Sequence, residues 1–384
     1  MTAAATPPPL VVLAAGGTGG HVFPAEALAA ELIRRGAALM LFTDRRGDVY
    51  GGTLGALESR TIRAGGLAGQ GLLARARSLA DLALGLLQAR RLLKTLAPRA
   101  VVGFGGYASV PTVLAATAAG IRTVVHEQNA VLGRANRLLA GRVDRIATSF
   151  AEVAAVPPRA VAKIVRTGMP VRPAFAGAQE YVPPAADGEI RLLVLGGSQG
   201  ARIFGEVVPA AVASLDPSLR RRLVISQQCR AEGLAAADAA YRQLQVTVDL
   251  APFFDDVPQR LAAAHLVIAR AGASTVAELT ALGRPAILIP YPFAIDDHQS
   301  ANARALAATG AAWVLPQQGF DADSLAGRLT ELFAGDGADL SKAAAAARAA
   351  GCPDAAARLA DVVGSVGGLG AGPSIITTAP GGRA

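Results

Sequence analysis

The sequence predicts an α/β protein made of two doubly wound domains, each built on a parallel sheet. Short apolar runs recur between segments of helical length, which is typical of repeated βαβ units. Hydrophobic residues make up 52% of the 384 residues and aromatic residues only 4%, so Ala, Leu and Val must form the core. The two halves also begin alike, because LVVLAAGGTGGH and LLVLGGSQGAR each join an apolar run to a glycine-rich turn.

The apolar runs give the positions of the expected buried strands. In the first half they cover residues 10–15, 38–43, 100–105, 122–127 and 145–149; in the second half they cover residues 191–197, 222–227, 245–250, 265–270 and 285–291. A Pro-, Gly- and Ala-rich stretch separates the halves. We therefore expect a first domain over 8–170, a linker over 171–190, a second domain over 191–364 and a disordered tail over 365–384.

Charge and composition limit the class of protein. The formal net charge is +8 and most basic residues are Arg, a balance that attracts anionic partners. Two cysteines are too few for a disulfide framework, which fits a reducing compartment. The N-terminus lacks a basic signal-peptide region, and no unbroken apolar stretch is long enough to span a bilayer. We expect a soluble or peripheral protein.

The first glycine loop, AAGGTGGH, follows a strand and opens a helix, so its amides and the helix dipole can bind an anion. A close packing turn is the alternative. The loop does not match the G-x-G-x-x-G fingerprint of dinucleotide-binding domains, and no Walker sequence is present. Asp44, at the end of the next strand, is placed as a ribose-binding acid would be, so a nicotinamide-dependent oxidoreductase stays an alternative. His21 lies in the first helical turn, where the dipole favours a neutral ring that can accept a proton.

Other polar groups follow predicted strands. His126, Glu127 and Asn129 stand at a carboxyl edge, where open α/β sheets bind ligands. Ser274 and Thr275 can cap the next such helix, and Glu278 can bind a sugar diol or simply complement the helix dipole.

Two further features concern metals and membranes. The adjacent acids 255–256 and 296–297 diverge rather than converge on an ion, so we expect solvated side chains and no metal site. Residues 71–99 mix leucines with arginines, as an interfacial helix would, or as an ordinary amphipathic helix would.

Seven motifs together resemble the MurG family of bacterial glycosyltransferases over residues 10–365. They are GGTGGHVFPA, GFGGYASVP, HEQNAVLGRANR, TGMPVRP, LGGSQGAR, RAGASTVAE and DDHQSANA. The resemblance implies a GT-B fold, in which two Rossmann-like domains face a cleft. It also implies inverting transfer of N-acetylglucosamine from UDP-GlcNAc to the C4 hydroxyl of undecaprenyl-linked muramyl-pentapeptide, giving lipid II for peptidoglycan, without a cofactor.

The resemblance further implies roles for individual residues. His21 is the leading candidate for the base, with His126 and Glu127 as alternatives. The donor would be bound by Thr18, Gly19, Gly20, Asn129, Arg172, Ser198, Phe254, Glu278 and Gln299. Residues 71–99 would dock on an anionic membrane at its cytoplasmic face, and cell-wall synthesis or division proteins, but not nucleic acid, are expected partners.

Two positions depart from the family pattern. Met169 stands where Asn is common, so any contact of that Asn side chain is lost, and His298 replaces a frequent Gln. A non-catalytic protein that binds nucleotide sugars or anionic lipids remains an alternative to the transferase.

Overall fold

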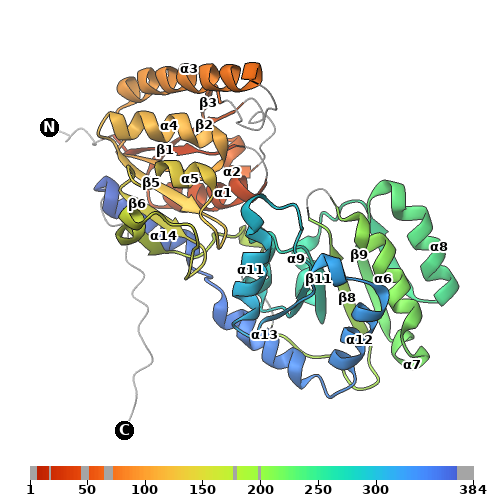
Figure 1. The fold of residues 1–384 in the computed structure, drawn as a ribbon. Coiled ribbons are helices and arrows are strands. Elements are labelled where there is room, and N and C mark those ends of the chain that lie inside the picture. The colour runs from red at the N-terminus through yellow and green to blue at the C-terminus, as the bar shows by residue number, and fades with distance from the viewer. Residues whose placement is uncertain are drawn as a thin grey trace, which may run out of the picture.

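The computed structural model describes residues 7–16, 19–44, 52–64, 72–175, 180–197 and 200–369. Two parallel α/β domains lie side by side, and the chain passes between them twice (Figure 1). Thr18 and Ser198 lie outside the described residues, as do residues 370–384. The disordered tail was expected over 365–384, but residues 365–367 form the end of the last helix.

The first domain has a seven-stranded sheet in the order β3-β2-β1-β4-β5-β6-β7, with every pair parallel. Its strands are β1 (Leu10–Ala14), β2 (Ala38–Thr43), β3 (Ser59–Thr61), β4 (Ala100–Gly103), β5 (Arg122–Glu127), β6 (Arg145–Thr148) and β7 (Ile164–Arg166). Its helices are α1 (Gly19–Arg34), α2 (Gly52–Gly55), α3 (Leu72–Leu96), α4 (Gly106–Ala118) and α5 (Arg134–Leu139), with the 3-10 helix η2 (Pro158–Lys163). The linker holds η3 (Pro173–Phe175).

The second domain has a six-stranded parallel sheet in the order β10-β9-β8-β11-β12-β13. Its strands are β8 (Ile190–Leu195), β9 (Leu223–Gln228), β10 (Thr247–Ala251), β11 (Leu266–Ala269), β12 (Ala286–Leu288) and β13 (Ala312–Val314). Its helices are α6 (Arg202–Ser214), α7 (Pro217–Arg220), α8 (Leu234–Leu244), α9 (Val257–Ala263), α10 (Ala273–Leu282), α11 (His298–Ala307), α12 (Ala322–Phe333) and α13 (Ala338–Ala350). Three short 3-10 helices, η4 (Ala231–Gly233), η5 (Ile295–Asp297) and η6 (Gln317–Gly319), complete it.

The predicted parallel sheets are confirmed, and each predicted run overlaps an observed strand. Three strands that the sequence did not reveal, β3, β7 and β13, are each three residues long. Each forms one end of its sheet. The exposed residues Ser59, Arg60 and Thr61 of β3 lack any apolar pattern, so pairing with β2 alone defines that strand.

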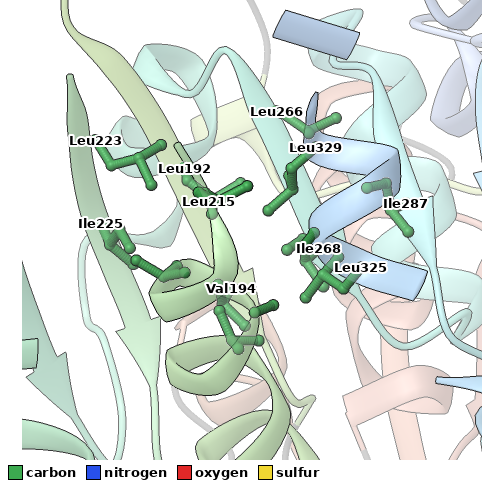
Figure 2. Close-up of a cluster of buried hydrophobic side chains, with 14 of the residues drawn as sticks. Leu192, Val194, Leu215, Leu223, Ile225, Leu266, Ile268, Ile287, Leu325 and Leu329 are labelled. Atoms are coloured by element: carbon green, nitrogen blue, oxygen red, sulfur yellow. The ribbon is translucent and has the colours of Figure 1, made fainter. Parts of the chain in front are cut away.

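Each sheet buries aliphatic side chains on both faces. In the second domain, Val194 of β8 and Ile268 of β11 pack with Leu325 and Leu329 of α12, and Figure 2 shows this cluster. The core of the first domain is split in the same way, one cluster on each side of its sheet. Fully burying such a side chain contributes about 1.5–3 kcal/mol, so these layers hold each sheet rigid beneath its loops.

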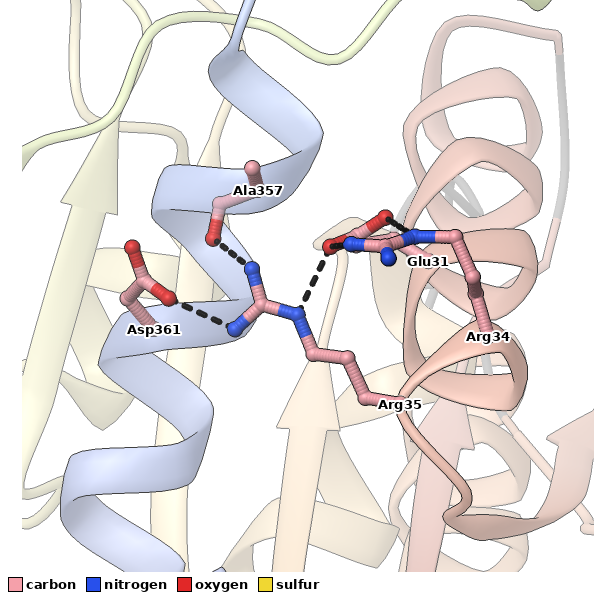
Figure 3. Close-up of polar contacts among 5 residues, drawn as sticks. All are labelled: Glu31, Arg34, Arg35, Ala357 and Asp361. Carbon is pink, nitrogen blue, oxygen red and sulfur yellow. Dashed lines mark hydrogen bonds and ion pairs between the residues drawn. The ribbon is translucent and has the colours of Figure 1, made fainter. Parts of the chain in front are cut away.

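The last helix, α14 (Ala355–Gly367), returns to the first domain although it follows the second domain in sequence (Figure 1). Its Leu359 and Val363 are buried in the core formed by β1, β4 and α1. Arg35 donates to Asp361 at 2.6 Å and to the Ala357 carbonyl at 3.0 Å, as Figure 3 shows. The chain therefore returns to the first domain after it has completed the second, and this return packs α14 on the first sheet. The domain boundaries stay a prediction.

No helix of the described ranges is both long and apolar enough to cross a membrane. Both cysteines are free thiols, with Cys229 buried and Cys352 partly buried.

Candidate active site

The candidate site lies between the two domains, where loops at the carboxyl ends of both sheets meet. In each sheet the strand order reverses beside the first strand, at β1/β4 and at β8/β11, which is the point where doubly wound sheets bind ligands. A cavity of about 490 Å³ opens there. His21, Asp44 and Glu127 line it from the first domain, and Ile295, Asp296 and His298 line it from the second.

His21 reaches this cavity from the first turn of α1. Its ring lies against Gly105 and Gly106, whose φ angles of +84° and +71° are ones that L side chains rarely adopt. A Cβ at Gly105 would stand only 3.2 Å from the His21 Cε1 atom. The glycines of GFGGY therefore make room for the imidazole.

The protonation state of His21 suits a base. Desolvation lowers its pKa below 6.5, so the ring is neutral near pH 7. Its Nδ1 is buried and has no hydrogen-bond partner among the residues that the structure describes. Glu127 raises this pKa through its charge, which would stabilise the imidazolium once a proton is taken.

His126 is fully buried, and both of its ring nitrogens are engaged. Its Nδ1 lies 3.2 Å from the Gln128 amide nitrogen, and its Nε2 lies 3.2 Å from the Gly168 carbonyl. Because an amide nitrogen donates and a carbonyl accepts, Nδ1 must be the acceptor and Nε2 must carry the proton. Burial lowers the pKa of His126 to about 4. This residue joins β5 to the segment between β7 and the linker, and it does not line the cavity.

Glu127 shapes the loop that follows β5. Its Oε1 accepts from the Asn129 backbone at 3.0 Å, and its Oε2 accepts from the Gly133 backbone and the Asn136 amide, both at 2.8 Å. These bonds engage both carboxylate oxygens in ordering the loop after β5. The geometry thus favours His21 among the three candidate bases.

Asn129 faces the second domain through a residue that sequence reasoning missed. The buried Asn302 of α11 donates to the Asn129 side chain at 3.1 Å, and it accepts from the Ala130 backbone at 2.8 Å. Asn302 also donates to the Ala271 carbonyl at 3.0 Å. A polar residue within the helical segment HQSANARALA was the available sign of such a contact.

Arg172 and Glu278 approach each other where the linker meets α10. The closest nitrogen of Arg172 lies 3.7 Å from Glu278 Oε1, and the Glu278 side chain is only 12% exposed. Burial raises the pKa of Glu278 to about 7, against a smaller lowering by Arg172. Glu278 is therefore a desolvated carboxyl that forms one long ion pair, with Arg172.

The amino end of α10 is open to a ligand. The expected side-chain capping by Ser274 or Thr275 is wrong, because the N-cap is Gly272 and no side chain caps the helix. The amides of the first turn remain without a side-chain cap, which is the arrangement that binds anionic groups.

The remaining predicted donor residues lie in the first turns of α1 and α11 and in the loop before α9. Gly19 and Gly20 begin α1, and Gln299 accepts from the Tyr291 backbone at 3.0 Å. Phe254 is buried beneath the Arg260 guanidinium, whose Cζ lies 4.0 Å from the ring centroid. Gln228 was missed: it accepts from Gly196 at 3.0 Å and donates to the Gly197 and Pro252 carbonyls, both at 3.1 Å, so it ties the second glycine loop to the loop before Phe254.

Asp255 and Asp256 are exposed, as expected, whereas the second pair of adjacent acids differs from expectation. Asp296 is not simply solvated, because it pairs across the cleft with Arg134 at 2.9 Å and with Arg137. Asp296 and Asp297 both have positive φ, at +54° and +51°, so the loop before α11 is held in a conformation that non-glycine residues rarely adopt.

A second cavity of about 310 Å³ lies on the linker side of the junction, between Phe150, Met169, Thr280 and Cys352. None of the predicted site residues lines it. His21, Glu127 and Asn129 line the first cavity instead, whereas Arg172, Phe254, Glu278 and Gln299 lie outside the lining of both cavities.

Two Rossmann-like domains that face a shared cleft define the GT-B class of glycosyltransferase. Residues 11–148 match the glycosyltransferase family 28 N-terminal domain, and residues 191–359 match the C-terminal domain of that family. The chain belongs to the family of UDP-N-acetylglucosamine–N-acetylmuramyl-(pentapeptide) pyrophosphoryl-undecaprenol N-acetylglucosamine transferases, as its similarity to proteins of that name shows.

Two of these proteins illustrate the similarity. One from Paramagnetospirillum magneticum is 61% identical over 91% of this chain and 95% of its own length. One from Rhodospirillum rubrum is 58% identical over 91% of this chain and 90% of its own length. Among solved structures, Acinetobacter baumannii MurG superposes with a TM-score of 0.76 at 30% identity, covering 93% of this chain and 100% of that one. The kitacinnamycin glycotransferase, at 17% identity and a TM-score of 0.69, shares the fold.

Proposed function

We propose that this protein transfers N-acetylglucosamine from UDP-GlcNAc to the C4 hydroxyl of the muramyl sugar in lipid I, giving lipid II for peptidoglycan synthesis. Its relatives carry a name that states this donor and this acceptor. The observation that carries the mechanism is the position of His21, a neutral imidazole with a buried, unpartnered nitrogen beside the cleft.

The position of His21 beside the cleft supports an inverting displacement at the anomeric carbon. His21 takes the proton of the acceptor hydroxyl while that oxygen attacks the anomeric carbon. The bond from this carbon to the pyrophosphate breaks, and its electron pair leaves with UDP. Attack from the face opposite UDP inverts the anomeric centre.

The second domain would hold the leaving group. The uncapped amides at the start of α10 and the guanidinium of Arg172 can stabilise the charge that develops on the pyrophosphate. Glu278, one and a half turns into the same helix, would accept hydrogen bonds from the ribose hydroxyls. The backbone near Phe254 would contact uracil, while Gly19, Gly20 and Asn129 would approach the donor from the first domain.

We further propose that α3 docks on an anionic membrane. Leu79, Leu84 and Leu87 are about half exposed, and Arg77 and Arg90 are exposed on the same helix. Exposed leucines among arginines suit a helix that lies in the headgroup region. Co-sedimentation with vesicles containing anionic lipid should fall when Leu84 and Leu87 are both replaced by Ser; equal binding by this variant would contradict the proposal.

Acceptor-dependent release of UDP tests the catalytic proposal. The protein should release UDP from UDP-GlcNAc only when a muramyl-pentapeptide lipid is supplied. His21→Ala should lower kcat by at least about a hundredfold while it keeps donor affinity, because only proton transfer is lost. His265→Asn is the matched control, since His265 contacts the Arg191 backbone at 3.0 Å, away from the cleft.

Two outcomes would overturn the proposal. UDP-GlcNAc binding without acceptor-dependent turnover would make this a binding protein. Saturable NAD(H) binding without UDP-GlcNAc binding would favour an oxidoreductase that uses Asp44.

A further inference from the structure

Three segments that are distant in sequence meet around the side chain of Arg172. The Arg172 Cζ atom lies 4.5 Å from the ring centroid of Phe23 on α1 and 5.1 Å from that of Phe175. The same guanidinium approaches Glu278 of α10 at 3.7 Å. The first domain, the linker and the second domain thus each contribute a group to one contact.

The aromatic rings, rather than the carboxylate, fix the position of this guanidinium. At 3.7 Å the approach to Glu278 is longer than a hydrogen bond, so it does not define the orientation of the planar group. Both ring distances lie within the range in which a cation and an aromatic face attract each other. Phe175 is buried in the core of the second domain, whereas Phe23 is partly exposed and belongs to the opposite domain.

Arg172 also has a donor with no acceptor. Its Nε is buried and has no hydrogen-bond partner within the described part of the chain. A buried guanidinium nitrogen without a partner is costly, and a negatively charged ligand in the cleft would satisfy it. The rings therefore hold the arginine in place while a donor nitrogen remains available.

We propose that Phe23 is a positioning residue for donor binding, which stacks on Arg172 and presents that guanidinium to the diphosphate of the nucleotide sugar. This inference rests on the proposed function. Because Phe23 moves with the first domain and Glu278 with the second, the stack also makes donor affinity depend on the approach of the two domains. Phe23 lies two residues after His21, so one helical turn supports both the base and the donor contact.

Steady-state kinetics and calorimetry on the full chain test this role. Phe23→Leu keeps an apolar side chain but removes the aromatic face, so KM for UDP-GlcNAc and Kd for UDP should both rise about five- to twentyfold. The kcat should change by less than about threefold, because the chemical step keeps its base. Phe23→Tyr retains the aromatic face and should restore the parental values.

A double-mutant cycle supplies the control. In an Arg172→Ala background, Phe23→Leu should have no further effect on UDP affinity, because the stacked cation is already gone. Equal UDP affinity of Phe23→Leu and the parent, or additive effects of the two changes, would overturn the inference. If Phe23→Leu does not fold, Phe23→Met takes its place. Failure of the parent protein to bind UDP-GlcNAc would instead count against the proposed function.

Discussion

Replacing Glu278 by Gln should stabilise the protein at neutral and alkaline pH while it weakens UDP binding. Burial moves the pKa of this carboxyl from its usual 4.5 to about 7. At about 1.4 kcal/mol per pH unit, ionising Glu278 in the folded protein therefore costs about 3 kcal/mol more than ionising it in the unfolded chain. Gln resembles the protonated acid and does not carry this cost.

The pH range of the effect follows from the two pKa values. Below pH 4.5 the carboxyl is protonated in both states, so the parent carries no penalty. Between pH 4.5 and about 7 the unfolded chain releases its proton more readily, and the parent loses stability relative to Glu278→Gln. Above pH 7 both states are ionised, and the full difference of about 3 kcal/mol should persist.

Urea unfolding of the parent and the variant at pH 4.5, 6 and 8 measures this difference. The advantage of Glu278→Gln in the free energy of unfolding should grow with pH and then level off. Glu206→Gln is the matched control, since Glu206 is 58% exposed and pairs only with a neighbouring arginine on α6. A stability difference between variant and parent that stays constant, or that shrinks as the pH rises, would refute the argument from burial. Unchanged UDP affinity of Glu278→Gln would refute the predicted role of Glu278 in UDP binding.

Three further predictions concern the base, the contact between the domains and the linker. Because desolvation lowers the pKa of His21, the acidic limb of the kcat/KM profile should lie below pH 6.5; a limb above that value would exclude His21 as the base. Asp296→Asn removes ion pairs between the domains, so the radius of gyration in X-ray scattering should increase. The loss of these pairs should cost about 1 kcal/mol in the free energy of domain contact, and high salt should produce the same increase in the parent protein. Gly168→Ala should lower stability by at least about 2 kcal/mol in urea unfolding, because φ is +79° and the new Cβ would lie 2.3 Å from the Cys352 Cβ. Cys352→Gly should recover part of that loss, and no recovery would mean that backbone strain alone acts.

The sheet architecture could be predicted from the sequence, because buried parallel strands are continuous apolar runs, often with glycine turns at their ends. Strands β2 and β5 begin and end as predicted. The short end strands β3, β7 and β13 were missed because three residues carry no periodicity, and only pairing with a neighbour defines them. Likewise, the sequence placed residues 355–364 within the expected second domain, and only the structure shows that α14 packs on the first sheet.

The candidate site divides in the same way. The position of His21 in the first helical turn indicated a possible base, and the family resemblance added His126 and Glu127 as alternatives. Only the tertiary structure distinguished them: the Gly168 carbonyl engages His126, and backbone amides engage Glu127. Selecting among neighbouring polar side chains requires knowing which donors and acceptors other segments bring to them.

By itself, the sequence determined the two-domain parallel architecture, the glycine loops and the set of polar groups at the strand ends. These features depend on local periodicity and on chemistry that each segment carries alone. The tertiary structure decided that α14 joins the first domain, that Asn302 and Asp296 bridge the cleft, and that Phe23 stacks on Arg172. Each of these contacts joins residues far apart in the chain, and their meeting depends on how the two domains pack rather than on any local pattern.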